Sequence, residues 1–142
     1  MGKRLSLQEL YKQHKGKVSD KWSLYLEEHD RILSPYRVKP IQLLEIGIQN
    51  GGSLEIWAKY FPRAENIIGC DINQACKNLR YDDRRITVIV GNANTDETEK
   101  CILQHAKSFD LIIDDGSHQS NDIIQSFVRY FPLLKEDGVY VV

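Results

Sequence analysis

The run Asp-Asp-Gly-Ser-His at residues 114–118 gathers side chains suited to acid–base or metal chemistry. Two adjacent carboxylates, Asp114 and Asp115, repel each other unless a cation or hydrogen-bond donors compensate. His118 follows three residues later and can act as a general base or as a metal ligand near neutral pH. A polar turn that satisfies the histidine is the alternative. The pattern favours a reactive site in which His118 is the catalytic candidate.

A glycine-rich stretch at residues 45–53, Glu-Ile-Gly-Ile-Gln-Asn-Gly-Gly-Ser, is a second candidate site. It follows an apolar run and leads directly into a helical pattern. Glycines in such a turn let the backbone approach a ligand, and the amides at the start of the helix then face it. The same pattern is also typical of a tight turn between a strand and a helix, so it needs a second signal.

Asp71 provides that signal, because it ends the next apolar run nineteen residues after Gly52. An acidic residue at this spacing accepts hydrogen bonds from ribose hydroxyls in nucleotide-binding strand–helix–strand units, although it could also cap a helix. Polar residues follow two later apolar runs, at 91–94 and 114–118. Ligands of parallel α/β sheets bind beyond the carboxyl ends of the strands, so we expect these residues to lie together.

The elements that must position these residues are visible as apolar runs and helical stripes. Five runs rich in Ile, Val and Leu are expected to be strands buried on both faces, at residues 41–46, 67–70, 86–90, 109–113 and 139–142. Helical patterns lie between them and begin near Ser53, Asp96 and Asn121. The alternation predicts an α/β fold, a Rossmann-like doubly wound sheet of about five parallel strands with helices on both faces.

N-terminal helices are expected to precede the sheet. One helix would start at Ser19 or Asp20 and end at residues 34–35, because proline disfavours helix in the residue before it. Its apolar face comprises Trp22, Tyr25, Leu26, His29 and Leu33. The predicted organisation is therefore an N-terminal helical cover at residues 1–40 and a Rossmann-like domain at residues 41–142.

Two cofactors fit the predicted site, a dinucleotide and S-adenosylmethionine. The dinucleotide fingerprint is G-x-G-x-x-G, whose second glycine admits the pyrophosphate, but Gln49 stands at that position here. Glu45 would also repel a phosphate, whereas its charge suits a cationic ligand with an amino group. The combination favours S-adenosylmethionine.

These motifs resemble class I S-adenosylmethionine-dependent methyltransferases. The residues that carry the resemblance are at 44–47, 51–54, 57, 60–62, 68–72 and 109–118. The sequence is most similar to the metal-dependent sugar O-methyltransferases of macrolide biosynthesis, the macrocin and mycinamicin type. The similarity extends over residues 19–142, since the Ser-Asp-Lys-Trp segment at 19–22 also looks like the segment before the cofactor domain in that group.

The resemblance implies a role for residues at each strand end. The cofactor-binding residues that it implies are Glu45, Gly47, Gly51, Gly52, Ser53, Asp71, Ile72, Asn92, Ala93 and Asp114. Among them, Glu45, Gly47 and Gly51 would line the methionine part of S-adenosylmethionine and Asp71 the ribose. The adenine would lie at residues 92–93, and Asp114 would close the pocket.

The resemblance also implies the reaction, methyl transfer to a hydroxyl of a sugar or glycosylated small molecule. Asp115 would be a ligand of Mg²⁺, and His118 would be the base that takes the hydroxyl proton. A sugar hydroxyl is a poor nucleophile at neutral pH, so a cation that orients and acidifies it, beside a base, makes attack on a sulfonium methyl feasible. Magnesium suits a site built from carboxylate oxygens.

The end of the chain departs from the family pattern. In that family the strand matching residues 139–142 is followed by an acidic pair that completes the metal site, and then by acceptor-binding elements. The sequence stops at Val142. We therefore expect a chain truncated at its C-terminus, in which the cofactor half of the site forms and the metal and acceptor halves are incomplete.

Composition restricts the partners and the location. The 142 residues carry 19 basic and 20 acidic side chains, a net charge of −1, which does not support nucleic-acid binding. No window approaches the roughly 18 apolar residues of a membrane span, and no signal segment opens the chain. The three cysteines lack paired Cys-x-x-Cys spacing, which indicates neither a zinc site nor disulfides. The expected location is the cytoplasm.

Two other readings remain open from the sequence. The first is an NAD(P)-dependent oxidoreductase or nucleotide-sugar epimerase, against which Gln49 argues. The second is a cofactor-binding fragment without activity of its own, whose apolar last strand pairs with another chain. An uncovered strand edge is a known route to association, so this strand is also the candidate site for homo-oligomer formation.

Overall fold

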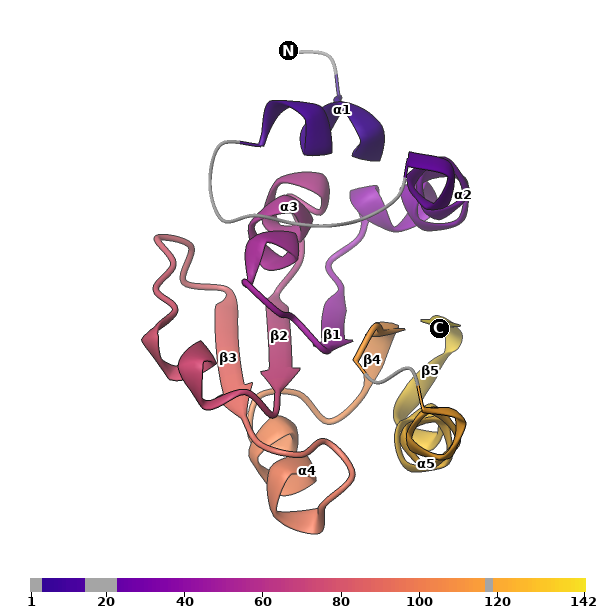
Figure 1. The fold of residues 1–142 in the computed structure, drawn as a ribbon. Coiled ribbons are helices and arrows are strands. Elements are labelled where there is room, and N and C mark those ends of the chain that lie inside the picture. The colour runs from indigo at the N-terminus through magenta and orange to yellow at the C-terminus, as the bar shows by residue number, and fades with distance from the viewer. Residues whose placement is uncertain (1–3, 15–22, 117–118) are drawn as a thin grey trace.

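The computed structural model describes residues 4–14, 23–116 and 119–142 (Figure 1). The helices are α1 (Leu7–Gln13), α2 (Ser23–Leu33), α3 (Gly52–Tyr60), α4 (Asp96–Leu103) and α5 (Ser120–Tyr130), with short 3-10 helices at Ser34–Val38, Gln74–Asn78 and Phe131–Leu133. The strands are β1 (Gln42–Ile46), β2 (Asn66–Asp71), β3 (Ile86–Val90), β4 (Phe109–Asp114) and β5 (Leu134–Val141).

The five strands form one parallel sheet in the order β3-β2-β1-β4-β5. The chain builds the sheet outward from β1 to β3, returns across it, and then adds β4 and β5 on the other side of β1. The direction of winding therefore reverses between β1 and β4, the position at which doubly wound sheets bind ligands. The predicted Rossmann-like fold is confirmed.

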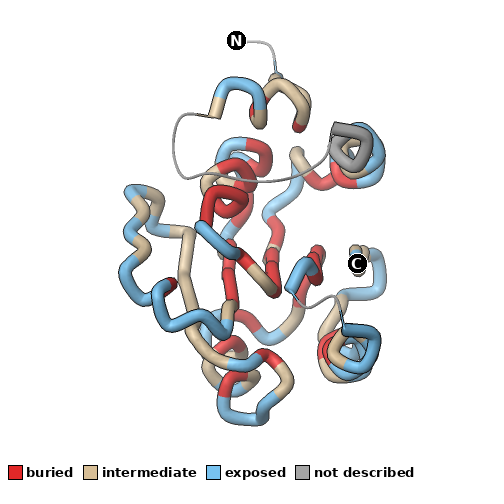
Figure 2. The backbone as a smooth tube through the Cα atoms, viewed as in Figure 1, coloured by how far each residue is buried: buried red, intermediate tan, exposed pale blue. Residues whose placement is uncertain are grey.

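Helices α1, α2 and α3 lie on one face of the sheet, and α4 and α5 lie on the other (Figure 1). The three inner strands β2, β1 and β4 are largely buried, the edge strands β3 and β5 are partly buried, and exposed residues are concentrated in the outer helical turns and loops (Figure 2). Burial on both faces explains the continuous apolar runs of β1, β2 and β4. The expectation that all five strands are buried on both faces is wrong for β3 and β5, because they are the two edge strands of the sheet and are only partly buried.

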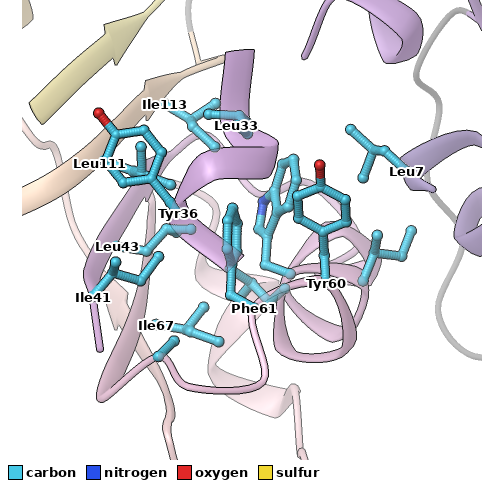
Figure 3. Close-up of a cluster of buried hydrophobic side chains, with 14 of the residues drawn as sticks. Leu7, Leu33, Tyr36, Ile41, Leu43, Tyr60, Phe61, Ile67, Leu111 and Ile113 are labelled. Carbon is cyan, nitrogen blue, oxygen red and sulfur yellow. The ribbon is translucent and has the colours of Figure 1, made fainter. Parts of the chain in front are cut away.

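The core on the first face joins the N-terminal helices to the sheet (Figure 3). Leu7 of α1 and Leu33 of α2 are fully buried in the same cluster as Trp57, Tyr60 and Phe61 of the α3 region. The rings of Tyr60 and Phe61 pack edge-on, with 4.8 Å between their centroids, and that of Trp57 is tilted against Phe61. The N-terminal helices thus share the core of the sheet, while the boundary at residue 40 stays a prediction.

The second face has its own core under α4 and α5. Ile102 of α4, Phe109 of β4 and Tyr130 of α5 are fully buried there, together with Cys70 of β2. Burial raises the pKa of the Cys70 thiol to about 12, so this thiol stays protonated as a small apolar side chain. All three cysteines are free in the structure.

Helix starts differ slightly from the sequence-based expectation. Thr95, not Asp96, caps α4, because its hydroxyl accepts a hydrogen bond from the Thr98 amide. Gly51 precedes α3 in a left-handed conformation, and the Ser53 hydroxyl does not cap that helix. Helix α5 begins at Ser120 with Gln119 before it, one residue earlier than Asn121 would give.

The last strand is longer than the apolar run predicts. Strand β5 begins at Leu134, five residues before the apolar run at 139–142, and its register against β4 shifts between Phe109 and Leu111. The charged residues Glu136 and Asp137 occupy this irregular part and are exposed. Within the ranges that the structure describes, no helix is both long and apolar enough to cross a bilayer.

Candidate cofactor site

A cavity of about 330 Å³ lies beyond the carboxyl ends of the four strands β1 to β4. Its volume falls in the range of small-molecule sites, which starts at roughly 300 Å³. Seven of the sequence-predicted site residues line it: Gly47, Asp71, Ile72, Asn92, Ala93, Asp114 and Asp115. The structure therefore brings residues from four separate strand ends to one cavity.

Gly47 is where the β1 and β4 loops meet. Its φ angle is +84°, a conformation that side chains disfavour, and a Cβ built on it would lie 2.2 Å from the Gly116 Cα. The Gly47 amide donates to the Cys70 carbonyl at 2.7 Å, and the Asp115 amide donates to the Ile46 carbonyl at 2.8 Å. Only glycine allows this close approach, which forms one side of the cavity.

Asp71 holds the glycine-rich loop at the end of β2 by hydrogen bonds. Its Oδ2 accepts hydrogen bonds from the amides of Ile48 at 2.9 Å and Gln49 at 3.0 Å, and its Oδ1 accepts one from the Asn73 amide at 2.9 Å. A carboxylate offers about four acceptor positions, so at least one remains available to a ligand hydroxyl. Asp71 thus shapes the loop and still faces the cavity.

Four predicted residues lie outside the cavity lining. Glu45 is fully buried behind the loop, and the Ser53 hydroxyl donates a hydrogen bond to its Oε1. Gly51 lies under Tyr81, whose hydroxyl donates to the Gly51 carbonyl at 2.8 Å. Gly52 opens α3 beside it and is buried. These residues support the loop from behind, and a direct ligand contact by any of them stays a prediction.

The segment after β3 forms another wall. Asn92 is exposed, and its Oδ1 accepts a hydrogen bond from the Asn94 amide at 2.9 Å, which tightens the turn. Ala93 is buried, and the Tyr130 hydroxyl donates to its carbonyl. A small side chain at 93 leaves room for a flat ligand against the backbone.

The two carboxylates at the end of β4 differ in environment. Asp114 is 6% exposed and receives long hydrogen bonds from the Gly116 amide at 3.3 Å and the Tyr140 hydroxyl at 3.4 Å, whereas Asp115 is exposed. Burial raises the pKa of Asp114 above its usual value, and the charge of Asp115 adds to this effect. The repulsion expected from adjacent carboxylates is therefore present.

The predicted base, His118, is not among the residues that the structure describes. Over the described ranges, no group of three or more His, Cys, Asp or Glu side chains is arranged to hold a metal ion. Asp115, the predicted metal ligand, is exposed at the cavity and could contribute an oxygen ligand.

Sequence reasoning missed the α5 wall of the cavity. Asp122, Ile123 and Ser126 line the cavity there, as do Gln49 and Asn94 from the two loops already expected at this edge. Gln49 was weighed only as an obstacle to pyrophosphate, and its φ of +49° places its backbone in the turn itself. The spacing of Asp122 and Ser126, one helical turn apart after the site run, was the signal that could have found the α5 wall.

The fold and the cavity together define a nucleotide-binding α/β domain of the methyltransferase type. Residues 44–142 match the family model described as "Methyltransferase domain". The chain belongs to this methyltransferase family.

Named relatives share the sequence over most of this chain. The mycinamicin VI 2''-O-methyltransferase of Micromonospora griseorubida is 34% identical over 125 residues, which cover 83% of this chain and 30% of that protein. The demethylmacrocin O-methyltransferase of Streptomyces fradiae is 32% identical over 135 residues, which cover 88% of this chain and 33% of that protein. The chain spans about a third of the length of these curated relatives.

A solved structure shows the same fold. It is the MycE methyltransferase from the mycinamycin biosynthetic pathway, in complex with Mg, S-adenosylhomocysteine (SAH) and mycinamycin VI. The two structures superpose with a TM-score of 0.80 at 31% identity, over 96% of this chain and 36% of that one.

Proposed function

We propose that this chain is the cofactor-binding part of an S-adenosylmethionine-dependent O-methyltransferase that acts on a hydroxyl of a sugar or glycosylated small molecule. The observation that carries the proposal is the cavity at the switch point of the sheet, with Gly47, Asp71, Asn92, Ala93 and Asp114 in its walls. The relatives named above are O-methyltransferases by name and support transfer to a hydroxyl. A further relative, the L-olivosyl-oleandolide 3-O-methyltransferase of Streptomyces antibioticus, has a glycosylated acceptor in its name and supports the acceptor class.

The cofactor would lie along the strand ends. Asp71 would accept a hydrogen bond from a ribose hydroxyl. The three backbone amides that donate to its carboxylate leave one acceptor position unoccupied. The adenine would lie against Asn92 and Ala93, and Asp114 would close the cavity near the reacting end. S-adenosylmethionine would supply a sulfonium methyl group as the electrophile. The acceptor hydroxyl oxygen would form a bond to this methyl group as its proton is removed, the bond from sulfur to methyl would break, and SAH would be released.

The chain's own contribution to the chemistry is proton removal and orientation. We assign the proton-accepting role to His118 and an oxygen ligand of Mg²⁺ to Asp115. The Mg²⁺ in the MycE complex supports the second assignment. Since the described residues contain no group of three or more side chains arranged to hold an ion, further ligands would have to come from elsewhere.

The cofactor half of the proposal is tested by titration calorimetry of the chain with SAH. We expect saturable binding, and Asp71→Asn should weaken it, because the amide replaces one acceptor oxygen with a donor. Asp82→Asn, an exposed change in the loop before β3, is the control and should bind as the unchanged chain does. A folded chain that takes up no SAH at millimolar concentration would contradict the proposal.

The catalytic assignment is tested in a protein extended to the full length of the relatives. His118→Ala should abolish methyl transfer to a sugar-bearing acceptor while SAH affinity is retained, because the base acts on the acceptor. Normal turnover by this variant would show that His118 is not the base. Mg²⁺ removal by a chelator should also slow transfer in that protein without altering SAH affinity.

The competing readings can be weighed against the family match. Neither the methyltransferase family nor the named relatives support the oxidoreductase or epimerase alternative. Tight binding of NADH, measured as an increase in its fluorescence, would instead support the oxidoreductase or epimerase alternative. A cytoplasmic location stays our proposal, and three free cysteines are compatible with a reducing compartment.

Self-association remains a separate proposal. Strand β5 lies at one edge of the sheet, paired with β4 on its other side. Light scattering at high concentration should detect dimers if this edge pairs with a second chain, and a strictly monomeric chain would contradict the idea.

A further inference from the structure

One face of α5 is hydrogen-bonded to the segment that follows β3. The Ser126 hydroxyl donates a hydrogen bond to Asn94 Oδ1 at 3.1 Å. The Asn94 amide group in turn donates from Nδ2 to the backbone carbonyl of Asp122 at 3.4 Å. Asn94 therefore makes contacts with two successive turns of the helix.

Arg129 strengthens the same junction from the next turn. Its Nη2 donates to the Asn94 carbonyl at 3.1 Å. Its Nη1 pairs with Asp96 Oδ1 at 2.9 Å and with Glu99 Oε2 at 2.5 Å. One guanidinium thus joins α5, the loop after β3 and the first turns of α4.

The junction controls two walls of the cavity. Asn94 belongs to the β3 wall, and Asp122 and Ser126 belong to the α5 wall, whereas Arg129 does not line the cavity. Positions 122, 126 and 129 follow helical spacing and so share one face of α5. The distance between the two walls is therefore set by contacts that lie partly behind the cavity surface.

We propose that Asn94 and Arg129 are positioning residues that fix the spacing between the β3 loop and α5, and so determine affinity and base selectivity at the purine end of the cofactor. This inference rests on the proposed function, which places the adenine at Asn92 and Ala93. A flat base is held by close contact on its faces, and a gap of 0.5–1 Å already forfeits roughly a quarter to a half of that attraction.

Arg129→Gln is the primary test, because it leaves every cavity-lining side chain in place. SAH and S-inosylhomocysteine, which differs in the exocyclic group of the base, are titrated separately. The unchanged chain should prefer SAH. In Arg129→Gln, SAH affinity should fall about tenfold, because the ligand must then order the two walls as it binds, and the preference over the inosine compound should shrink.

Arg85→Gln is the matched control. The Arg85 side chain is 26% exposed against 25% for Arg129, and it too joins an ion pair, with Asp83, to backbone carbonyls such as that of Ala58. It lies before β3, at the opposite end of that strand from the cavity. Its loss should lower the melting temperature and leave both ligand affinities unchanged.

Two milder variants keep the test decisive if Arg129→Gln fails to fold. Arg129→Lys retains a charge for the acidic pair but lacks the second guanidinium nitrogen, which donates to the Asn94 carbonyl. Ser126→Ala removes a single hydrogen bond to Asn94. Each should weaken SAH binding about threefold and reduce base selectivity.

The outcomes separate the two proposals. If the unchanged chain binds neither compound, the proposed function fails. If it binds SAH but shows no preference between the bases, or if the Arg129 variants lose affinity for both compounds equally or for neither, the positioning role of Asn94 and Arg129 is wrong.

Discussion

Gly47 lies so close to Gly116 that a single methyl group added at Gly47 would not fit. Gly47→Ala should lower stability and abolish SAH binding, because its Cβ would lie 2.2 Å from backbone and its φ angle of +84° disfavours alanine by about 1–2 kcal/mol. Urea unfolding and SAH calorimetry measure the two effects. Gly116→Ala is the control for stability, since a Cβ there would have its nearest neighbour at an ordinary 3.5 Å. Equal stability of the two variants would contradict the crowding described at Gly47.

The buried Asp114 carboxyl should make stability depend on pH. Its pKa is raised from 3.8 in the folded chain, so the folded state holds the proton longer than the unfolded state does. The free energy of unfolding contributed by this group is therefore fully present below pH about 3.9 and is lost as the pH rises through the folded pKa.

Asp114→Asn removes that titration. The variant should be more stable than the unchanged chain at neutral pH, and its stability should vary less from about pH 4 upward, as urea unfolding across pH would measure. Asp115→Asn, which changes the exposed neighbour, should keep most of the pH dependence. A variant at 114 that is less stable at neutral pH would show that its long hydrogen bonds outweigh burial.

At the scale of elements, the turn into α3 depends on the fit between Gly51 and Tyr81. A Cβ at Gly51 would lie 2.0 Å from the Tyr81 hydroxyl oxygen and 2.8 Å from Leu79 Cδ1. Gly51→Ala should therefore destabilise the chain, and it should cost less when Tyr81→Phe has removed the hydroxyl. A double-mutant cycle by urea unfolding measures the coupling. Additive effects would mean that the φ angle of +79° alone accounts for the cost.

Elements with an uninterrupted pattern could be predicted closely, and those that depend on distant contacts could not. Strand β3 spans Ile86–Val90 as predicted, because its apolar run is unbroken, although as an edge strand it is only partly buried. The start of β5 was missed, because Glu136 and Asp137 interrupt its apolar pattern and the pairing of Leu134 with Phe109 lies far away in the sequence.

The same distinction applies to the candidate site. Gly47, Asp71, Asn92 and Asp114 could be placed at one edge because each ends a strand, and parallel strands end together. The burial of Glu45 behind the loop depends on where Ser53 points once α3 has formed, which no local pattern specifies. The contribution of α5 required knowing which of its faces meets the loop after β3.

At the scale of the whole molecule, the N-terminal helices should contribute to global stability. Leu33→Ala should cost about 2–5 kcal/mol, because Leu33 is fully buried between α2 and the sheet core. Its neighbour Ile32, 37% exposed, provides the control, and Ile32→Ala should cost much less. Urea unfolding should show one transition for both variants. A separate early transition in Leu33→Ala would mean that the helices unfold independently of the sheet.

The sheet order also bears on how the chain is synthesised. Strand β1 is central, and its partner on one side, β2, follows it directly, whereas its partner on the other side, β4, is made only after β3 and α4. While the chain leaves the ribosome, the half-sheet β3-β2-β1 can form with one edge of β1 still unpaired. Leu43 and Leu44, buried on opposite faces in the finished protein, flank that edge. At that stage β1, which becomes the central strand, exposes an unpaired edge next to apolar side chains and can pair with another chain. A chaperone that covers this edge would prevent such pairing until β4 has been made.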